Sequence, residues 1–326
     1  MKKGQILVLI ILLIIMSVVI WIGACHRTKD DQKVPTETTA TPEGSDISLV
    51  TPTLPPEPTD PPVATATPTP EKAEFPAINA SDFADLSTKA VSWEAGFAKF
   101  EDGTTGVWYD TSVDKYVKGY DYTYIKNDSD TVKEIYLTFN ISYEKDPLIK
   151  ILDILKDYNT KNSEKVYVTF FVHSECLDWT DLMRRIDSEG HQIAIRAFPS
   201  GMSGLSVKEI ETKLLAVEAK FRTIFGESRR MYYYRPGDEF STREIAVANA
   251  LGYKVVFHCF KYQDWDKSRY NADGSNGKLN AMLSVLDNFH DGSVIQLTVS
   301  ELNSEILGKV IEQGQSQGFT FERLDR

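Results

Sequence analysis

The stretch KEIYLTFNIS, residues 133–142, decides the fold of this chain. Its apolar and β-branched run from Ile135 to Phe139 predicts a buried strand. Further along, strand-like apolar runs alternate with amphipathic helix-like runs as far as Leu324. Such alternation is typical of a parallel sheet covered by helices. The sequence therefore predicts an α/β fold, a distorted and incomplete parallel (β/α) barrel of about seven strands, with its chemistry at the carboxyl ends of the strands.

Upstream of the barrel, composition divides the chain into an anchor, a linker and a folded domain. Lys2 and Lys3 precede a long apolar run, which predicts a transmembrane helix or a signal helix within residues 1–25. Residues 26–80 are rich in Thr, Pro, Glu and Asp, which predicts a disordered linker. The folded domain then spans residues 81–326 and includes an aromatic-rich lead-in, residues 81–132, that we expect to pack on the barrel.

Two interpretations of the anchor stay open. A retained transmembrane helix fits the long apolar run, whereas Ile22-Gly23-Ala24-Cys25 resembles a lipobox in which Cys25 is lipidated. Both predict a protein at the cell membrane with its folded domain outside the cytoplasm. The three scattered cysteines predict neither a disulfide framework nor a zinc site and fit a Gram-positive-type surface. The net charge of -11, without a downstream Lys/Arg run, argues against nucleic acid as a partner.

The order of motifs along the domain resembles a known enzyme family. YLTF, VTFFV, GHQI, YRP, LGYKVVF and GFTFERLD follow one another as in NodB-homology polysaccharide deacetylases, carbohydrate esterase family 4. Ser92-Trp93 and Thr298-Val299-Ser300 are most similar to delta-lactam-biosynthetic de-N-acetylases of peptidoglycan. The resemblance implies a divalent metal held by one Asp and two His, a second Asp as base and a late His as acid.

The catalytic motifs of that family are degenerate in this chain. The resemblance puts the base at Asn140, whose amide accepts no proton at neutral pH, and a metal ligand at Ile141, which has no donor atom. The two ligand histidines fall on Arg196, whose charge repels a cation, and on Ser200, and the acid falls on Leu297. We therefore expect lost catalysis and no metal. Zinc or another divalent metal is expected only if displaced ligands have rebuilt a site.

Other polar and aromatic residues remain around the former cleft. Arg196, Arg235, Asp238, Asp264 and Trp265 offer guanidinium groups and an aromatic ring that suit a glycan or a carboxylate-bearing wall fragment. In the alternative interpretation, Arg235 and Asp264 pair with each other and only brace the loops.

A rebuilt metal site is the remaining possibility at the strand ends. His173 and His258 follow strands and could face the mouth, where Asp238 or Glu301 could join them. Nothing in their spacing requires convergence, so two hydrogen-bonded polar side chains remain the alternative. His191 enters a strand from the opposite end of the barrel, which favours a structural role.

Three functions follow from these observations. The first is a membrane-tethered, catalytically inactive deacetylase-like protein that binds cell-wall glycan, a peptidoglycan fragment or a surface protein. The second is an active metal-dependent N-deacetylase of peptidoglycan or a related polysaccharide, a hydrolase acting on the N-acetyl C–N bond. The third is a structural or interaction protein whose cleft is closed.

Overall fold

The computed structural model describes residues 72–93, 95–99, 105–109, 114–123, 133–141, 143–197, 201–264 and 275–325. The predicted anchor with Cys25, most of the predicted linker, Ser200 and Trp265 lie outside these residues. Within the described part of the chain, no helix combines the length and apolar character that a membrane crossing needs.

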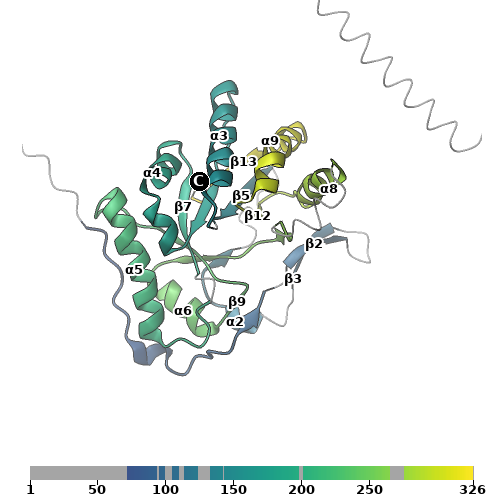
Figure 1. The fold of residues 1–326 in the computed structure, drawn as a ribbon. Helices are drawn as coiled ribbons and strands as arrows, with labels where there is room; N and C mark the ends of the chain where they lie inside the picture. Colours follow the sequence, from purple (N-terminus) through teal and green to yellow (C-terminus); the bar gives the residue numbers. More distant parts are fainter. Residues whose placement is uncertain are drawn as a thin grey trace, which may run out of the picture. The chain divides into compact units, whose positions relative to one another are not determined.

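A curled parallel sheet forms the centre of the folded unit (Figure 1). Among the described residues it has nine strands, eight of them in one path and β13 (Thr320–Phe321) paired with the start of β5 (Glu134–Asn140). The predicted α/β class and incomplete parallel barrel are confirmed. In spatial order the path is β11 (Phe260–Lys261), β12 (Ser293–Thr298), β5 (Glu134–Asn140), β6 (Thr169–Val172), β7 (Gln192–Arg196), β8 (Tyr233–Arg235), β10 (Lys254–Val256) and β4 (Tyr122–Thr123).

The strands that exceed the predicted seven are short. β4 comes from the lead-in and pairs with β10 through two residues, and β11 follows β10 as a separate two-residue strand. The lead-in also forms β1 (Val91–Ser92), which is antiparallel to β9 (Glu239–Phe240), and the hairpin of β2 (Ala95–Lys99) and β3 (Thr105–Tyr109).

Helices follow most strands and surround the sheet in Figure 1. The longest described helix, α5 (Val207–Phe225), begins at a capping box in which Ser206 and Glu209 each bond the other's backbone amide, which fixes its first turn. The larger helices are α3 (Lys145–Lys161), α4 (Thr180–Ser188), α5 (Val207–Phe225), α6 (Thr242–Ala250), α8 (Ser275–Leu286) and α9 (Glu301–Ser316). The short ones are η1 (Ala80–Phe83), α2 (Asp114–Val117) and η3 (Ser174–Asp178).

Strand alternation gives the barrel two distinct layers of side chains. Because successive residues of a strand point to opposite faces, Leu137 and Phe139 join the large apolar core, whereas Tyr136, Thr138 and Asn140 share the other face. A smaller cluster fills that inner face. Its members are Tyr136, Phe171, Ala194, Val256, Val294 and, from the C-terminal segment, Leu324.

The chain enters the folded unit beside the amino-terminal ends of β8 and β10. Ala73 donates its amide to Glu227 O at 3.0 Å, and Arg222 bonds the Ala73 carbonyl. The ring centroid of Phe75 is 4.9 Å from the guanidinium carbon of Arg222 and 4.4 Å from that of Arg230. This contact, which we term the Phe75 clasp, fastens the start of the described chain to α5 and to the loop before β8.

Candidate functional site at the barrel mouth

The carboxyl ends of the strands surround a small recess, the mouth recess. It is lined by Trp93, Asn140, Arg196, Arg235, Asp238 and His258, together with neighbouring residues of the same loops. Its volume is about 20 Å³. A cavity of roughly this size holds about one water molecule, so a sugar ring cannot enter it and a ligand would lie across the mouth.

Arg235 is the central side chain of the mouth and is almost fully buried. Its Nη1 donates to Asn140 Oδ1 at 3.1 Å and its Nη2 to Thr138 Oγ1 at 2.8 Å. The guanidinium also lies 3.8 Å from the ring centroid of Phe171, which gives the cation an aromatic face below it. Burial, and then the neighbouring charge of Arg196, lower the pKa of Arg235 well below its usual range. Asn140, where the resemblance puts the base, therefore serves as a neutral acceptor for a buried cation.

Arg196 differs from Arg235 in the partners that the described residues give its guanidinium. The two residues are register partners on β7 and β8, and Arg196 is the more exposed of them. Within the described residues its side chain makes no hydrogen bond or ion pair, although burial lowers its pKa and the charge of Asp238 raises it. Asp238 instead pairs with Lys261 at 2.7 Å. The described part of the mouth thus presents an unpaired cationic group to solvent.

Asp264 belongs to a separate network. It is buried, and its Oδ2 accepts from the Thr298 amide and from Asn303 Nδ2 at 2.7 Å. Its Oδ1 has no hydrogen-bond partner among the described residues, and burial raises its pKa. Since Arg235 bonds Asn140 and Thr138 instead, the alternative that Arg235 pairs with Asp264 is wrong.

Two of the degenerate catalytic positions do not face the mouth. Leu297 lies on the same face of β12 as Ile295, opposite to Gln296, which lines the recess. Ile141 follows β5, is fully buried and donates its amide to Phe171 O at 2.9 Å. Both side chains belong to the large apolar core. These two side chains therefore not only lack a donor atom but also lie in the apolar core, away from the mouth.

The two candidate histidines are not brought together in the recess. His258 lines it, is bonded to Gln296, and has its pKa lowered well below the usual range, mainly by burial. His173 lies beside η3 instead, where Nδ1 is 2.7 Å from Glu175 and Nε2 is 3.4 Å from Cys176 Sγ. Glu301, another proposed ligand, pairs with Lys150.

The donor set of the mouth does not fit a divalent metal. In the described part of the chain, no three His, Cys, Asp or Glu side chains converge on one point. Where the resemblance puts metal ligands stand the apolar Ile141 and the cationic Arg196, and the amide oxygen of Asn140 accepts a hydrogen bond from Arg235. A cation here would face two guanidinium groups, and like charges repel strongly where water is excluded.

Three contributors to the mouth are missing from the sequence prediction. Thr138 and Phe171 hold the guanidinium of Arg235, and Gln296 bonds His258. Strand alternation could have found the first, because Thr138 precedes Asn140 by two residues and so shares its face. Phe171 and Gln296 lie in apolar runs, where the sequence alone does not separate the inner face from the outer one.

Comparison with known proteins agrees with this architecture. The profile of the polysaccharide deacetylase family matches residues 127–256. An uncharacterised 30.6 kDa protein of Geobacillus stearothermophilus is 33% identical over 196 residues, covering 59% of this chain and 70% of that protein. The peptidoglycan-N-acetylmuramic acid deacetylase PdaA of Bacillus subtilis is 30% identical over 212 residues, covering 64% and 76%.

A solved structure extends the likeness to three dimensions. The structure of Bacillus subtilis PdaA, a family 4 carbohydrate esterase, matches with a TM-score of 0.62 and 27% identity. The match covers 74% of this chain and 97% of that structure. The resemblance inferred from the motifs is therefore confirmed, and this chain belongs to the polysaccharide deacetylase family.

Proposed function

We propose that this protein is a non-hydrolysing member of its family that binds cell-wall glycan across the barrel mouth. The observation that carries the proposal is the pair of guanidinium groups at the ends of β7 and β8, Arg235 held by neutral partners and Arg196 unpaired among the described residues. Positions where the family's reaction needs a base, ligands and an acid carry groups unable to fill those roles. The site supports recognition rather than hydrolysis.

The chemistry of the mouth favours a carboxylate-bearing glycan. A free guanidinium binds a carboxylate through two parallel N–H donors, and a partly buried site strengthens that bond. A similar protein, PdaA, acts by its name on peptidoglycan N-acetylmuramic acid, a sugar that bears a carboxylate. We infer that the ligand is a peptidoglycan fragment whose carboxylate meets Arg196 while its sugar rings lie over the rim.

The location of the protein is part of the same proposal. The lysine-flanked apolar run in residues 1–25 supports tethering at the cell membrane through a helix or a lipid, with residues 26–80 as a spacer. Mass spectrometry of the mature N-terminus distinguishes the two anchors. A diacylglyceryl group on Cys25 would establish the lipoprotein, and an unprocessed Met1 would establish the helix.

Binding is tested by titrating muropeptides and, separately, N-acetylglucosamine oligomers against the full chain in a non-ionic detergent. We expect muropeptides to bind and the neutral oligomers to bind more weakly. Arg196→Gln should weaken muropeptide binding roughly tenfold, the effect of losing one charge-assisted contact. Arg184→Gln, on the exposed face of α4, is the matched control and should bind as the wild type. Equal binding by all three proteins contradicts a role for Arg196, and no binding at all favours a surface-protein partner or a closed cleft.

Loss of hydrolysis is tested separately by measuring acetate release from the same compounds with zinc or cobalt added. We expect no release above the rate without protein. Metal-dependent acetate release, abolished by Asp238→Asn or His258→Gln, would replace this proposal with an active deacetylase that uses displaced ligands.

A further inference from the structure

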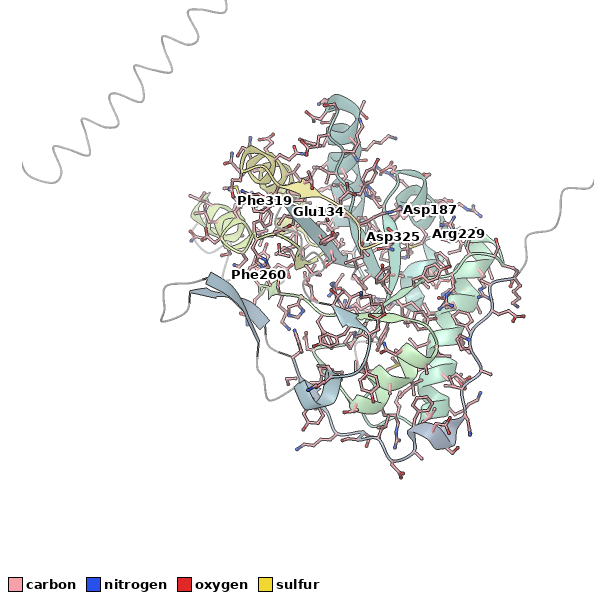
Figure 2. The ribbon with its side chains drawn as sticks, turned by 180° about the vertical axis from the view of Figure 1, so that it is seen from behind. Glu134, Asp187, Arg229, Phe260, Phe319 and Asp325 are labelled. Atoms are coloured by element: carbon pink, nitrogen blue, oxygen red, sulfur yellow. The ribbon has the colours of Figure 1, made fainter. Side chains whose placement is uncertain are left out.

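A second cavity lies at the opposite end of the barrel, beside the amino-terminal ends of β7 and β8. Its volume is about 190 Å³, far larger than that of the mouth recess. We call it the basal cavity and define it by His191, Arg229, Arg230 and Arg323, with Asp187, Tyr232 and Asp325 at its walls. Asp187, Arg229 and Asp325 lie on one side of the folded unit in Figure 2, although they come from α4, the loop before β8 and the end of the described chain.

His191 provides a buried donor in this cavity. The residue is 1% exposed, and its ring makes edge contacts with Tyr167 and Phe170. The Val168 amide donates to Nδ1 at 3.4 Å, so Nδ1 is the unprotonated nitrogen and Nε2 carries the hydrogen. Burial, followed by the charges of Arg323 and Arg185, lowers the pKa of His191 to about 4, which keeps the ring neutral at ordinary pH.

The hydrogen on Nε2 has no acceptor in the described part of the chain, although the nitrogen is buried. A buried donor without an acceptor loses the hydrogen bond that water gave it in the unfolded chain, which disfavours the folded state. Since His191 lines the basal cavity, an oxygen atom of a molecule in that cavity is the acceptor that its position allows.

Three guanidinium groups line the same cavity. Arg229 pairs with Asp187 at 2.6 Å, and Arg323 pairs with Asp325 at 2.7 Å and donates to Gly190 O at 2.8 Å. Arg230 has no carboxylate partner among the described residues. Its Nη2 donates to Leu251 O at 3.1 Å, and its guanidinium lies 5.0 Å from the ring centroid of Tyr232.

The charges of the cavity favour an anion. With His191 neutral, the three arginines exceed the two aspartates, which leaves one net positive charge. A group with several acceptor oxygens can take the hydrogen of His191 and contact arginines on both sides, whereas one carboxylate reaches fewer donors. Tyr232, which is 58% exposed, offers an aromatic face to whatever carries the anion.

We propose that the basal cavity is a binding site for a phosphate group, held by the Nε2 hydrogen of His191 and by Arg229, Arg230 and Arg323. The ligand is inorganic phosphate or a phosphate ester of a polyol or sugar, which share this chemistry. The site is separate from the mouth and does not depend on the proposed glycan binding.

The proposal is tested on the full chain in non-ionic detergent by titration with inorganic phosphate, glycerol phosphate and, as the carboxylate arm, acetate. We expect phosphate to bind and acetate to bind at least tenfold more weakly. Tighter binding of glycerol phosphate than of inorganic phosphate identifies an ester as the ligand, and the reverse identifies free phosphate. Arg323→Gln and Arg229→Gln should each weaken phosphate binding roughly tenfold or more.

Two controls separate this site from general charge attraction. Lys208→Gln at the start of α5 and Lys309→Gln on α9 each remove one exposed positive charge elsewhere and should leave phosphate binding unchanged. With ¹⁵N-histidine labelling, phosphate should shift the Nε2 resonance of His191 and leave that of His258 in place. No binding of phosphate, equal losses in all four variants, or an unmoved His191 Nε2 resonance would each overturn the proposal.

Discussion

At the mouth of the barrel, the guanidinium of Arg235 is held by Asn140, Thr138 and the ring of Phe171 around a recess of about 20 Å³. At the base, His191 leaves Nε2 without an acceptor among the described residues, in a cavity of about 190 Å³. Family membership directs attention to the mouth, yet its innermost polar groups satisfy one another. Substitutions inside the mouth should therefore act mainly on stability, and substitutions at the rim or the base mainly on binding.

The largest effect should come from introducing an acid at Ile141, where the resemblance puts a metal ligand. Ile141→Asp places a carboxylate in the apolar core, away from the mouth recess, and should lower the free energy of unfolding by more than about 3 kcal/mol. Ile141→Val is the control and should cost about 1 kcal/mol. Urea denaturation measures both. A loss below about 1 kcal/mol for Ile141→Asp would mean that the side chain reaches the mouth or solvent after all.

Near the base, Glu218 should make stability fall as the pH rises. Burial raises the pKa of this glutamate from 4.5 to about 7 in the folded chain, although Tyr253 and the Met231 amide bond its Oε1. Between these two pKa values the unfolded chain binds fewer protons than the folded one. The stability that Glu218 contributes through its raised pKa is therefore present below about pH 4.5 and is lost as the pH rises through 7.

Glu218→Gln keeps the acceptor oxygen and removes the titration. The free energy of unfolding of Glu218→Gln minus that of the wild type should be about 2 kcal/mol larger at pH 8 than at pH 5. The reason is that a tenfold change in a proton-binding constant corresponds to about 1.4 kcal/mol. Denaturant unfolding at the two pH values tests this. Glu211→Gln, on the same helix and paired with Lys208 at 2.9 Å, is the control that should show no such difference. Parallel pH profiles for wild type and Glu218→Gln would contradict the prediction.

A smaller effect, opposite in sign to that of Ile141→Asp, is expected at Asn140, where the resemblance puts the base. Asn140→Asp puts a carboxylate opposite the Nη1 of Arg235 and should raise the free energy of unfolding by about 1–2 kcal/mol at pH 7. Arg235 lowers the folded-state pKa of the introduced carboxylate. The gain is therefore present above its unfolded pKa of about 4 and is lost as the pH falls through the lowered value.

Thr138→Val is the control for Asn140→Asp, because it removes a hydrogen bond to the same guanidinium without adding charge. It should destabilise the protein by about 1 kcal/mol at both pH 7 and pH 3. Thermal unfolding distinguishes the two variants. A destabilised Asn140→Asp variant at pH 7 would indicate that desolvation of the carboxylate outweighs its pairing with Arg235.

The smallest change in stability should come from the rim. Asp238 is largely exposed and its pair with Lys261 should contribute less than about 1 kcal/mol, so Asp238→Asn should unfold almost as the wild type does. The same substitution removes the carboxylate whose charge acts most strongly on Arg196 and should strengthen muropeptide binding several-fold. Weaker binding by Asp238→Asn would assign Asp238 to contacts with the glycan itself.

The stretch KEIYLTFNIS, which contains β5, shows how far the sequence determines the fold. Its apolar run predicted β5 to within one residue at either end, and alternation places Thr138 with Asn140 on the inner face. β4 and β11 were not predicted because each has only two residues and lies outside the apolar runs from which the seven strands were predicted.

The partners of the site residues were harder to predict than its strands. Arg235 was expected near the cleft, but its choice of Asn140 over Asp264 depends on which side chains the register of β8 turns inward. Similarly, Leu297 was read as a substituted acid, and only its place on β12 shows that it faces the apolar core. The partner of Arg235 and the face to which Leu297 points both depend on contacts between residues far apart in the chain.

The Phe75 clasp also has a mechanical consequence. A pull on the chain that arrives at residue 72 is applied beside the amino ends of β8 and β10, far along the strands from the mouth. Because the guanidinium of Arg230 both stacks on Phe75 and lines the basal cavity, the load would reach that cavity first. A displacement of Phe75 would then disturb the basal cavity while the network around Arg235 kept its contacts.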